Sequence, residues 1–413
     1  TDMQALLADG EAYFKVAVVA DQVYAQFITK SAVHIYALDL DRPGLDRVVA
    51  QLRDSIVREE NGVLVTYPFD AALAHQLYLS LMGPIDAELA DVRHLVFEPD
   101  GAMLQLPPYL LVVEQKGINA YLARSAQPDG DAFDFTGIKW LGRAREMSIS
   151  VSPRSFADVR VIPASRASKP YLGLGNNAQP PIEVRPIAAV GQSCDWPLSV
   201  WQHPIAPDEL FLANQIVGGQ NGNVVTGQAF SDTSLLARDD LDDYRVLQFA
   251  THGLVTAPRP ECPARPALVT SFGDGNSDGL LSFREVFDLK LDADVVILSA
   301  CDTAGMATVG ASRDAGITTG GNFALDGLVR AFVGAGARSV VASHWPVPDD
   351  FDATKRLIGG MFSAAPGTPL ARSLNAAQQG LMDDAATSHP YYWAAFVILG
   401  DGQKALLTKP AGQ

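Results

Sequence analysis

Apolar positions in the first part of the chain follow the spacings of strands and helices in turn. Residues 11–20 and 22–30 are rich in Val, Tyr and Phe and are separated by a short polar break, which predicts a β-hairpin. Residues 31–40 predict a third strand. Apolar residues then recur every three or four positions over 45–57 and 71–85, so each of these segments predicts an amphipathic helix.

The next part of the chain is less regular. Residues 93–112 predict two strands joined by a turn at Asp100–Gly101, with a pair of prolines interrupting the second strand. From about 124 to 170 the sequence is polar and broken. We therefore expect a domain boundary near residue 150, which divides the chain into domains 1–150 and 151–413.

The second half alternates continuous apolar runs with helical segments. Strands that are buried on both faces and alternate with helices are typical of a parallel sheet. The predicted class is α/β with a mostly parallel sheet. The strands are expected at 169–176, 222–227, 244–253, 292–300, 337–345 and 392–401. The helices are expected at 206–217, 231–241, 324–336, 351–362 and 369–384.

The net charge of the chain excludes some classes of binding partner. The chain has 413 residues and a formal net charge of −16, so neither nucleic acid nor an anionic membrane surface is the expected partner. No apolar run reaches the roughly 18–20 residues that a membrane span needs. The first residues do not have the pattern of a signal peptide, and the sequence does not begin with an initiator Met. We expect a cytoplasmic protein, cut from a longer chain.

The three cysteines predict neither a metal site nor a disulfide framework. Cys194, Cys262 and Cys301 are 68 and 39 residues apart, which matches no zinc or redox signature. Because the count is odd and low for this length, we do not expect a disulfide framework. Cys194 and Cys262 are interpreted as small buried hydrophobic residues.

Two predicted strands end in residues that could act together in catalysis. His252 and Gly253 end one strand, and Cys301 ends another. Ligands of open α/β sheets bind at the carboxyl ends of the strands, so His252 could take the proton of the Cys301 thiol. The backbone N–H groups of Gly253 and Cys301 could form an oxyanion hole. The alternative is that both side chains are ordinary core residues.

At these residues the sequence resembles the CHAT domain, a caspase-like peptidase domain often found after TPR repeats. The matching segments include YRVLQFATHGL, DGLLSFREV, ADVVILSACDTAG and HPYYWAAFVILGD. The resemblance implies that His252 is the general base and acid, Cys301 the nucleophile and Gly253 an oxyanion contributor. The implied fold is a caspase-like three-layer sandwich preceded by a degenerate caspase-like half. Residues 1–150 contain no cysteine and are interpreted as that pseudo-protease half.

The resemblance also indicates a substrate groove along residues 343–349. Ser343 and Trp345 are candidate substrate-binding residues, although core packing is an equal alternative for Trp345. Asp302 and Asp349 are candidates for meeting a basic side chain before the cleaved bond. His344 is a weaker candidate for the base. Residues 306–323 are rich in Gly, Ser and Thr and predict a surface loop, in which Arg313 is a candidate processing point.

A second pattern of candidate ligands lies between His252 and Cys301 in the sequence. Oxygen-bearing residues fit the spacing of an EF-hand loop, with Gly279 at its sixth position. The candidate calcium ligands are Asp274, Asn276, Asp278, Ser282 and Glu285. The preceding segment reads as a strand instead of the required helix, so the alternative is a turn at Asp278–Gly279 followed by a helix capped by Ser282.

The function expected from these observations is regulated proteolysis of a protein substrate, in a bacterium, by a cysteine endopeptidase. The His252/Cys301 dyad needs no cofactor, with calcium as the one exception considered. A TPR-type region or a regulatory partner is expected upstream. The alternative function is a peptide-recognition module of the same fold without catalysis. A small-molecule hydrolase is disfavoured because no G-x-S-x-G elbow is present.

Overall fold

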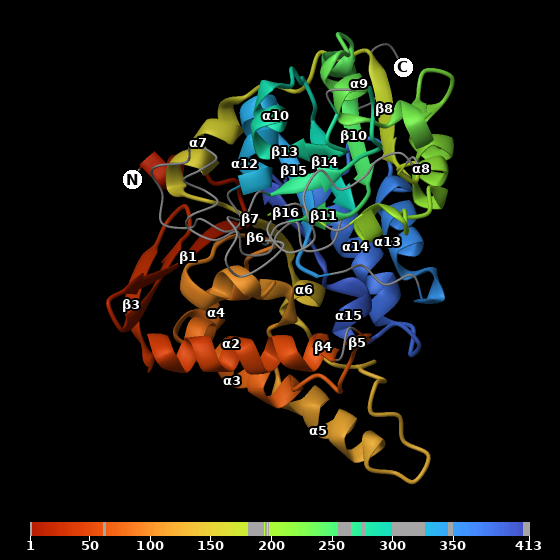
Figure 1. The fold of residues 1–413 in the computed structure, drawn as a ribbon. Helices are drawn as coiled ribbons and strands as arrows, with labels where there is room; N and C mark the ends of the chain where they lie inside the picture. The colour runs from red at the N-terminus through yellow and green to blue at the C-terminus, as the bar shows by residue number, and fades with distance from the viewer. Residues whose placement is uncertain are drawn as a thin grey trace. The chain divides into compact units, whose positions relative to one another are not determined.

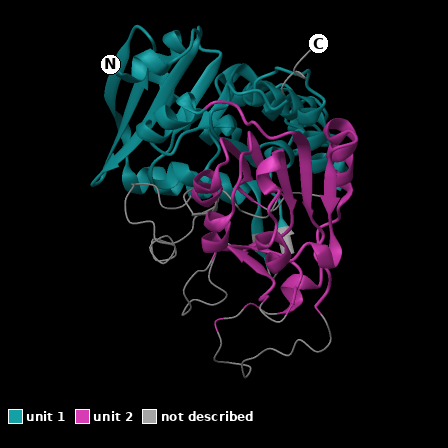
Figure 2. Cartoon of the chain, turned by 90° about the horizontal axis from the view of Figure 1, so that it is seen from above, with its two compact units in different colours: residues 1–162, 347–413 teal, residues 163–346 magenta. Residues whose placement is uncertain are grey.

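The computed structural model describes residues 2–60, 63–180, 194, 196, 198–254, 266–274, 277–299, 327–345 and 350–407. It contains two compact units, formed by residues 1–162 with 347–413 and by residues 163–346 (Figure 2). The sequence analysis assigned residues 347–413 to the second part of the chain. They group with the first unit because β16 (Phe396–Gly400) pairs in parallel with β7 (Glu146–Ile149).

The first unit contains a sheet with helices around it (Figure 1). Its other strands are β1 (Glu11–Val19), β2 (Gln22–Ile28), β3 (Val33–Asp41), β4 (Arg58–Glu60), β5 (Val63–Val65) and β6 (His94–Glu98). Its helices are α1 (Asp2–Leu6), α2 (Arg42–Ile56), α3 (Ala71–Met82), α4 (Asp86–Leu89), α5 (Gln115–Ser125), α6 (Leu141–Ala144), α7 (Pro153–Val161), α13 (Ala353–Phe362), α14 (Leu370–Met382) and α15 (Pro390–Trp393).

The main sheet of the first unit has the strand order β3-β2-β1-β6-β7-β16. β1, β2 and β3 are antiparallel, which confirms the predicted hairpin and third strand, and Ala20 makes the hairpin turn with a φ of 54°. β1, β6, β7 and β16 run parallel. Helices cover both faces. Phe156 of α7 packs on Tyr13, and on the opposite face Tyr36 donates a hydrogen bond to the carbonyl of Leu81 in α3.

In the first unit the structure differs from the sequence prediction at the start of α2 and after β6. α2 begins at Arg42, before the predicted residue 45, because Asp41 accepts a hydrogen bond from the Gly44 N–H and Pro43 fits the first turn. The second strand predicted within 93–112 is wrong. Gly101–Gln105 forms a 3-10 helix, which begins where Asp100 accepts from the Gly101 N–H. The prolines that follow lack the N–H groups that a sheet needs.

The second unit contains a parallel sheet and a smaller antiparallel one (Figure 1). Its strands are β8 (Lys169–Gly175), β9 (Asn223–Val225), β10 (Tyr244–Ala250), β11 (Gly253–Leu254), β12 (Ala267–Val269), β13 (Leu280–Ser282), β14 (Val295–Ser299) and β15 (Ser339–Ser343). Its α-helices are α8 (Asp208–Ala213), α9 (Asp232–Leu236), α10 (Phe283–Asp288) and α12 (Gly327–Ala335). α8 continues as one π-helical turn, Asn214–Gly218.

The parallel sheet of the second unit has the order β15-β14-β10-β8-β9, which confirms the predicted α/β class. Helices lie on both of its faces. Gly173 of β8 faces Leu210 of α8, and on the other face Phe249 of β10 contacts Phe332 of α12 with ring centroids 5.3 Å apart. β11, β12 and β13 form the antiparallel sheet beyond the end of β10.

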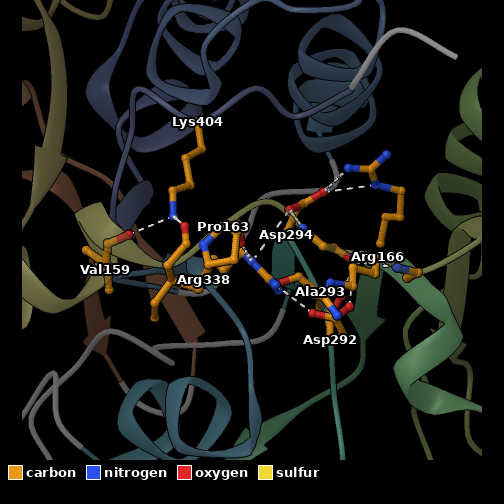
Figure 3. A network of polar contacts seen from close by, with 12 residues as sticks. Val159, Pro163, Arg166, Asp292, Ala293, Asp294, Arg338 and Lys404 are labelled. Carbon is orange, nitrogen blue, oxygen red and sulfur yellow. Dashed lines mark hydrogen bonds and ion pairs between the residues drawn. The ribbon is translucent and has the colours of Figure 1, made fainter. Parts of the chain in front are cut away.

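A polar network fixes the amino ends of β10, β14 and β15. Arg245 forms a 2.7 Å ion pair with Asp294. Arg338 forms a 2.6 Å ion pair with Asp292 (Figure 3). The Arg338 Nε also donates to the carbonyl of Pro163. Arg338 and Asp294 are 6% and 3% exposed, whereas their partners Asp292 and Arg245 remain partly exposed, so each pair joins one buried charge to one that contacts solvent. The carboxyl ends of the same strands lie at the opposite edge of the sheet, where His252 follows β10.

Candidate functional site

The backbone of His252 is fixed between two sheets of the second unit. His252 lies two residues after the end of β10 and immediately before β11. The Thr251 hydroxyl donates to the carbonyl of Val269 at 2.6 Å, and the Val269 N–H donates to the carbonyl of His252 at 2.9 Å. These two bonds to Val269 of β12 lie on either side of the His252 Cα atom. They therefore fix the direction in which the imidazole leaves the backbone.

A backbone carbonyl holds the imidazole ring itself. His252 Nε2 lies 2.6 Å from the carbonyl oxygen of His203. A carbonyl oxygen can only accept, so Nε2 carries the proton and donates it. In the neutral ring the other nitrogen, Nδ1, is then an acceptor. The ring is therefore held in the tautomer that could take a proton from a thiol through Nδ1, and it is only partly covered by protein.

The register of the parallel sheet relates His252 to the predicted nucleophile. Ala250 of β10 pairs with Ser299 of β14. In the sequence His252 follows Ala250 by two residues, and Cys301 follows Ser299 by two residues. Cys301 itself lies outside the described residues. The two strands therefore end at the same level of the sheet. In the sequence, His252 and Cys301 each follow directly beyond that end.

The predicted groove residues fall into two groups. Gly253 is partly exposed and opens β11 opposite Leu268. Ser343 and Trp345 are 0% and 1% exposed, which favours the core-packing alternative for the tryptophan. His344, the weaker candidate base, is 3% exposed and its ring lies 6.4 Å from that of Trp345. Three residues predicted to act near the cleaved bond or in loop processing lie outside the described residues, namely Asp302, Arg313 and Asp349.

The candidate calcium loop uses several of its oxygen atoms for local structure. Ser282 and Glu285 form a capping box at the start of α10, in which the Glu285 carboxylate accepts from the Ser282 N–H at 2.8 Å. Asp278 accepts from the Leu280 N–H at 3.0 Å, and Gly279 makes the turn with a φ of 74°. This geometry is the turn-and-helix alternative of the sequence analysis. Asn276 lies outside the described residues, and those that are described contain no cluster of metal-ligating side chains.

Two acidic groups at this turn have raised pKa values. Burial raises the pKa of Asp232, and the hydrogen bond from the Ser277 hydroxyl opposes that shift. Burial, with the charges of Asp232 and Glu285, likewise raises the pKa of Asp278. Calcium binding by this loop stays a prediction.

Sequence reasoning missed a second polar constellation in the first unit. Ser148 Oγ lies 3.1 Å from His94 Nε2, and His94 Nδ1 lies 2.7 Å from Glu11 Oε1. This order of groups has the pattern of a serine hydrolase triad. All three residues are at most 4% exposed, so a substrate cannot contact the hydroxyl. Arg160 also pairs with Glu11, and the set is a buried connection between β1, β6, β7 and α7.

The interpretation of Cys194 as a small buried hydrophobic residue without a disulfide bond is wrong. Cys194 is disulfide-bonded, and its partner lies outside the described residues. A low, odd count of cysteines argued against a disulfide framework, but two cysteines are enough for a single bridge. Experiments on thiol reactivity in this chain therefore need a mild reduction step first.

The comparisons with known proteins complete the description of the site. A family model for the CHAT domain matches residues 71–401. The chain belongs to the CHAT domain family. The match covers both compact units, and it includes His252 and Cys301. No helix in the described part of this CHAT chain is long and apolar enough to cross a membrane.

Similar proteins include large TPR proteins and proteinases. The chain is 28% identical to tetratricopeptide repeat protein 28 of Mus musculus and of Homo sapiens, over 236 and 235 residues. The match spans 49% of this chain but 9% and 8% of those proteins. Two solved structures are similar with a TM-score of 0.42, the Arg-specific cysteine proteinase gingipain R and a complex of the pro- and mature domains of Porphyromonas gingivalis RgpB. They are 12% and 13% identical, cover 88% of this chain, and are matched over 74% and 77% of their own length.

Proposed function

We propose that this CHAT chain is a cysteine endopeptidase of the caspase-like type, with His252 as general base and acid and Cys301 as nucleophile. The observation that carries the proposal is the 2.6 Å contact between His252 Nε2 and the His203 carbonyl, which leaves Nδ1 as a proton acceptor. The matched ends of β10 and β14 support the pairing of the two residues. Membership of the CHAT family agrees with it.

The proposed reaction proceeds through a thioester. His252 Nδ1 takes the proton of the Cys301 thiol, and the thiolate sulfur attacks the carbonyl carbon of the peptide bond. The backbone N–H groups of Gly253 and Cys301 stabilise the negative oxygen of the tetrahedral intermediate. His252 then gives its proton to the leaving amine as the C–N bond breaks. A water molecule, deprotonated by His252, hydrolyses the thioester and releases the acid and the thiol.

Substrate preference follows from charge in this proposal. Asp302 and Asp349 would meet a basic side chain before the cleaved bond, and a net charge of −16 favours the approach of basic segments. Ser343 ends β15 and begins the segment 343–349, to which an extended peptide would add through main-chain hydrogen bonds in this proposal.

The first unit serves as a pseudo-protease half in the same proposal. β6 and β7 are adjacent parallel strands in its sheet, as β10 and β14 are in the second unit. β6 ends at Glu98, which accepts hydrogen bonds from Tyr13 and Lys15 and is 3% exposed. No cysteine occurs in residues 1–162 or 347–413, so this unit offers no thiol nucleophile. The TPR repeats named in the relatives suggest that such repeats accompany this chain in its full protein.

Cleavage-site profiling tests the proposal. A peptide library made from a whole proteome is incubated with the reduced wild-type chain, Cys301→Ala and His252→Ala, and new N-termini are quantified. We expect sites that depend on both residues and that follow basic or neutral residues. Identical profiles in all three proteins would refute the proposal. Retention of particular peptides by all three, without cleavage, would assign the chain to the recognition-module alternative.

A further inference from the structure

The carbonyl that holds His252 belongs to a short segment with its own supports. Residues 201–205 have no regular secondary structure beyond the 3-10 turn that ends at Trp201. The Trp201 indole N–H donates to the carbonyls of Thr270 and Gly279, both at 3.0 Å. His203 is exposed, so the burial of its own side chain does not fix the position of its carbonyl. The position must come from the residues that flank it.

Two consecutive asparagines at the carboxyl end of β8 bind this segment on both sides of His203. The Asn177 side-chain amide donates to the carbonyl of Trp201 at 3.1 Å. The Asn176 amide donates to the carbonyl of Ile205 at 3.1 Å. One asparagine thus holds the chain two residues before His203, and the other holds it two residues after.

Chemistry fixes which end of the Asn177 amide faces the segment. Its nitrogen lies 3.2 Å from the carbonyl of Ala178 as well as 3.1 Å from that of Trp201. Two acceptors can be served only by the NH₂ group, so the amide cannot be turned around. Asn177 is 2% exposed, and an unpaired group at this depth is costly, so the bond to Trp201 cannot be exchanged for water without loss.

The asparagines are themselves fixed to the strand that carries His252. Asn176 has a φ of 50°, a left-handed conformation that Asn adopts more readily than most residues. Its N–H donates to the carbonyl of Ala250, the last residue of β10, and its carbonyl accepts from the Gly227 N–H at 2.9 Å. The Ala178 N–H donates to the Ser271 hydroxyl at 2.8 Å. The bond to Ala250 therefore ties Asn176 to the end of β10, two residues before His252.

We propose that Asn176 and Asn177 are positioning residues for His252. They hold residues 201–205 so that the His203 carbonyl accepts from Nε2, and they thereby select the tautomer in which Nδ1 receives the thiol proton. The proposal rests on the proposed peptidase function for its catalytic consequence, but the tautomer of His252 is a separate property that can be measured by itself.

The test uses variants that exchange donor for acceptor with little change of shape. Asn177→Asp and Asn176→Asp place a carboxylate oxygen against a carbonyl oxygen, and Asp tolerates the left-handed conformation at residue 176. Asn176→Gly removes the donor and keeps the backbone, and it remains informative if an Asp variant does not fold. The matched control is Gln179→Ala, because this exposed residue has only a marginal 3.5 Å contact with the Gln202 carbonyl.

Two readouts separate this proposal from the proposed function. Ring ¹³C and ¹⁵N shifts of labelled histidine, with His252→Ala for assignment, report the tautomer of His252. Iodoacetamide alkylation of reduced protein, quantified by peptide mass spectrometry, reports the reactivity of Cys301. We expect wild type and Gln179→Ala to show the Nε2–H tautomer. We expect the Asp variants to lose it and to alkylate Cys301 at least about tenfold more slowly, by analogy with the loss of the partners that orient metal-bound histidines.

Each failure points to a different claim. A folded Asn177→Asp variant and a folded Asn176→Gly variant with the wild-type tautomer and alkylation rate would overturn the positioning role. If wild-type alkylation of Cys301 is indifferent to His252→Ala, the peptidase proposal fails instead. The tautomer spectra would in that case still decide whether the asparagines position the ring.

Discussion

His389 is expected to make the stability of the first unit depend on pH. The residue is 1% exposed, its Nε2 lies 2.8 Å from the carbonyl of Tyr67, and its Nδ1 accepts from the Tyr391 N–H at the start of α15. Burial lowers the pKa of His389 from 6.5 to about 4, although the Tyr67 carbonyl opposes that shift. The folded protein therefore keeps this imidazole neutral where an unfolded chain binds a proton.

The sign and size of the effect follow from linkage. The contribution of His389 is complete above about pH 6.5 and is lost as the pH falls towards about 4, because only the unfolded state gains the proton in that window. At about 1.36 kcal/mol per unit, the shift corresponds to about 3 kcal/mol over the whole window. Between pH 7 and pH 5 it corresponds to about 2 kcal/mol.

Urea unfolding at closely spaced pH values measures this contribution. His389→Asn keeps an acceptor for the Tyr391 N–H, since Asn is a good N-cap residue, and removes the imidazole. We expect the wild type to lose about 2 kcal/mol more than the variant between pH 7 and pH 5. The control is His34→Asn, which makes the same exchange at a partly exposed imidazole 3.6 Å from Glu88. Parallel pH curves for wild type and His389→Asn would show that burial of His389 does not make the stability depend on pH.

Three further substitutions test the packing around the site, each by urea unfolding and alkylation of Cys301. Trp201→Phe removes an indole donor shared by two buried carbonyls, and we expect a loss of about 1–3 kcal/mol; an unchanged midpoint would contradict this. Gly175→Ala places a Cβ 2.3 Å from the Ala250 carbonyl oxygen, so we expect β8 to separate from β10 and Cys301 to lose its reactivity. Ser282→Ala removes the capping box with Glu285 and should cost about 1 kcal/mol without slowing alkylation; slower alkylation would show that the cap supports the site.

The strands that position the site were predictable because their burial leaves a plain sequence signal. The run Val295–Ser299 is buried at every position, and so is almost every residue of β10, as expected for strands covered on both faces. The placement of His252 at a strand end followed from the same pattern. β7 was missed because it is only four residues long and lies in a polar stretch, although it joins β6 to β16.

The partners of His252, the proposed catalytic base, were not predictable from the sequence. His252 is held by a backbone carbonyl 49 residues away, and a carbonyl contact does not constrain which residue type supplies it. Asn176 and Asn177 resemble ordinary turn residues in the sequence, and their role depends on the left-handed backbone and on a segment some 25 residues further along. The grouping of residues 347–413 with the first unit depends on strand pairing, which local periodicity cannot report.

The most direct test of the central claim measures the reactivity of each cysteine. The chain is mildly reduced, alkylated with iodoacetamide between pH 5 and 9, and Cys194, Cys262 and Cys301 are quantified separately in wild type and His252→Ala. An unperturbed thiol titrates near about 8.5. We expect Cys301 alone to react rapidly near neutral pH and His252→Ala to remove this reactivity. A Cys301 that titrates like the other two cysteines, with or without His252, would rule out the proposed dyad.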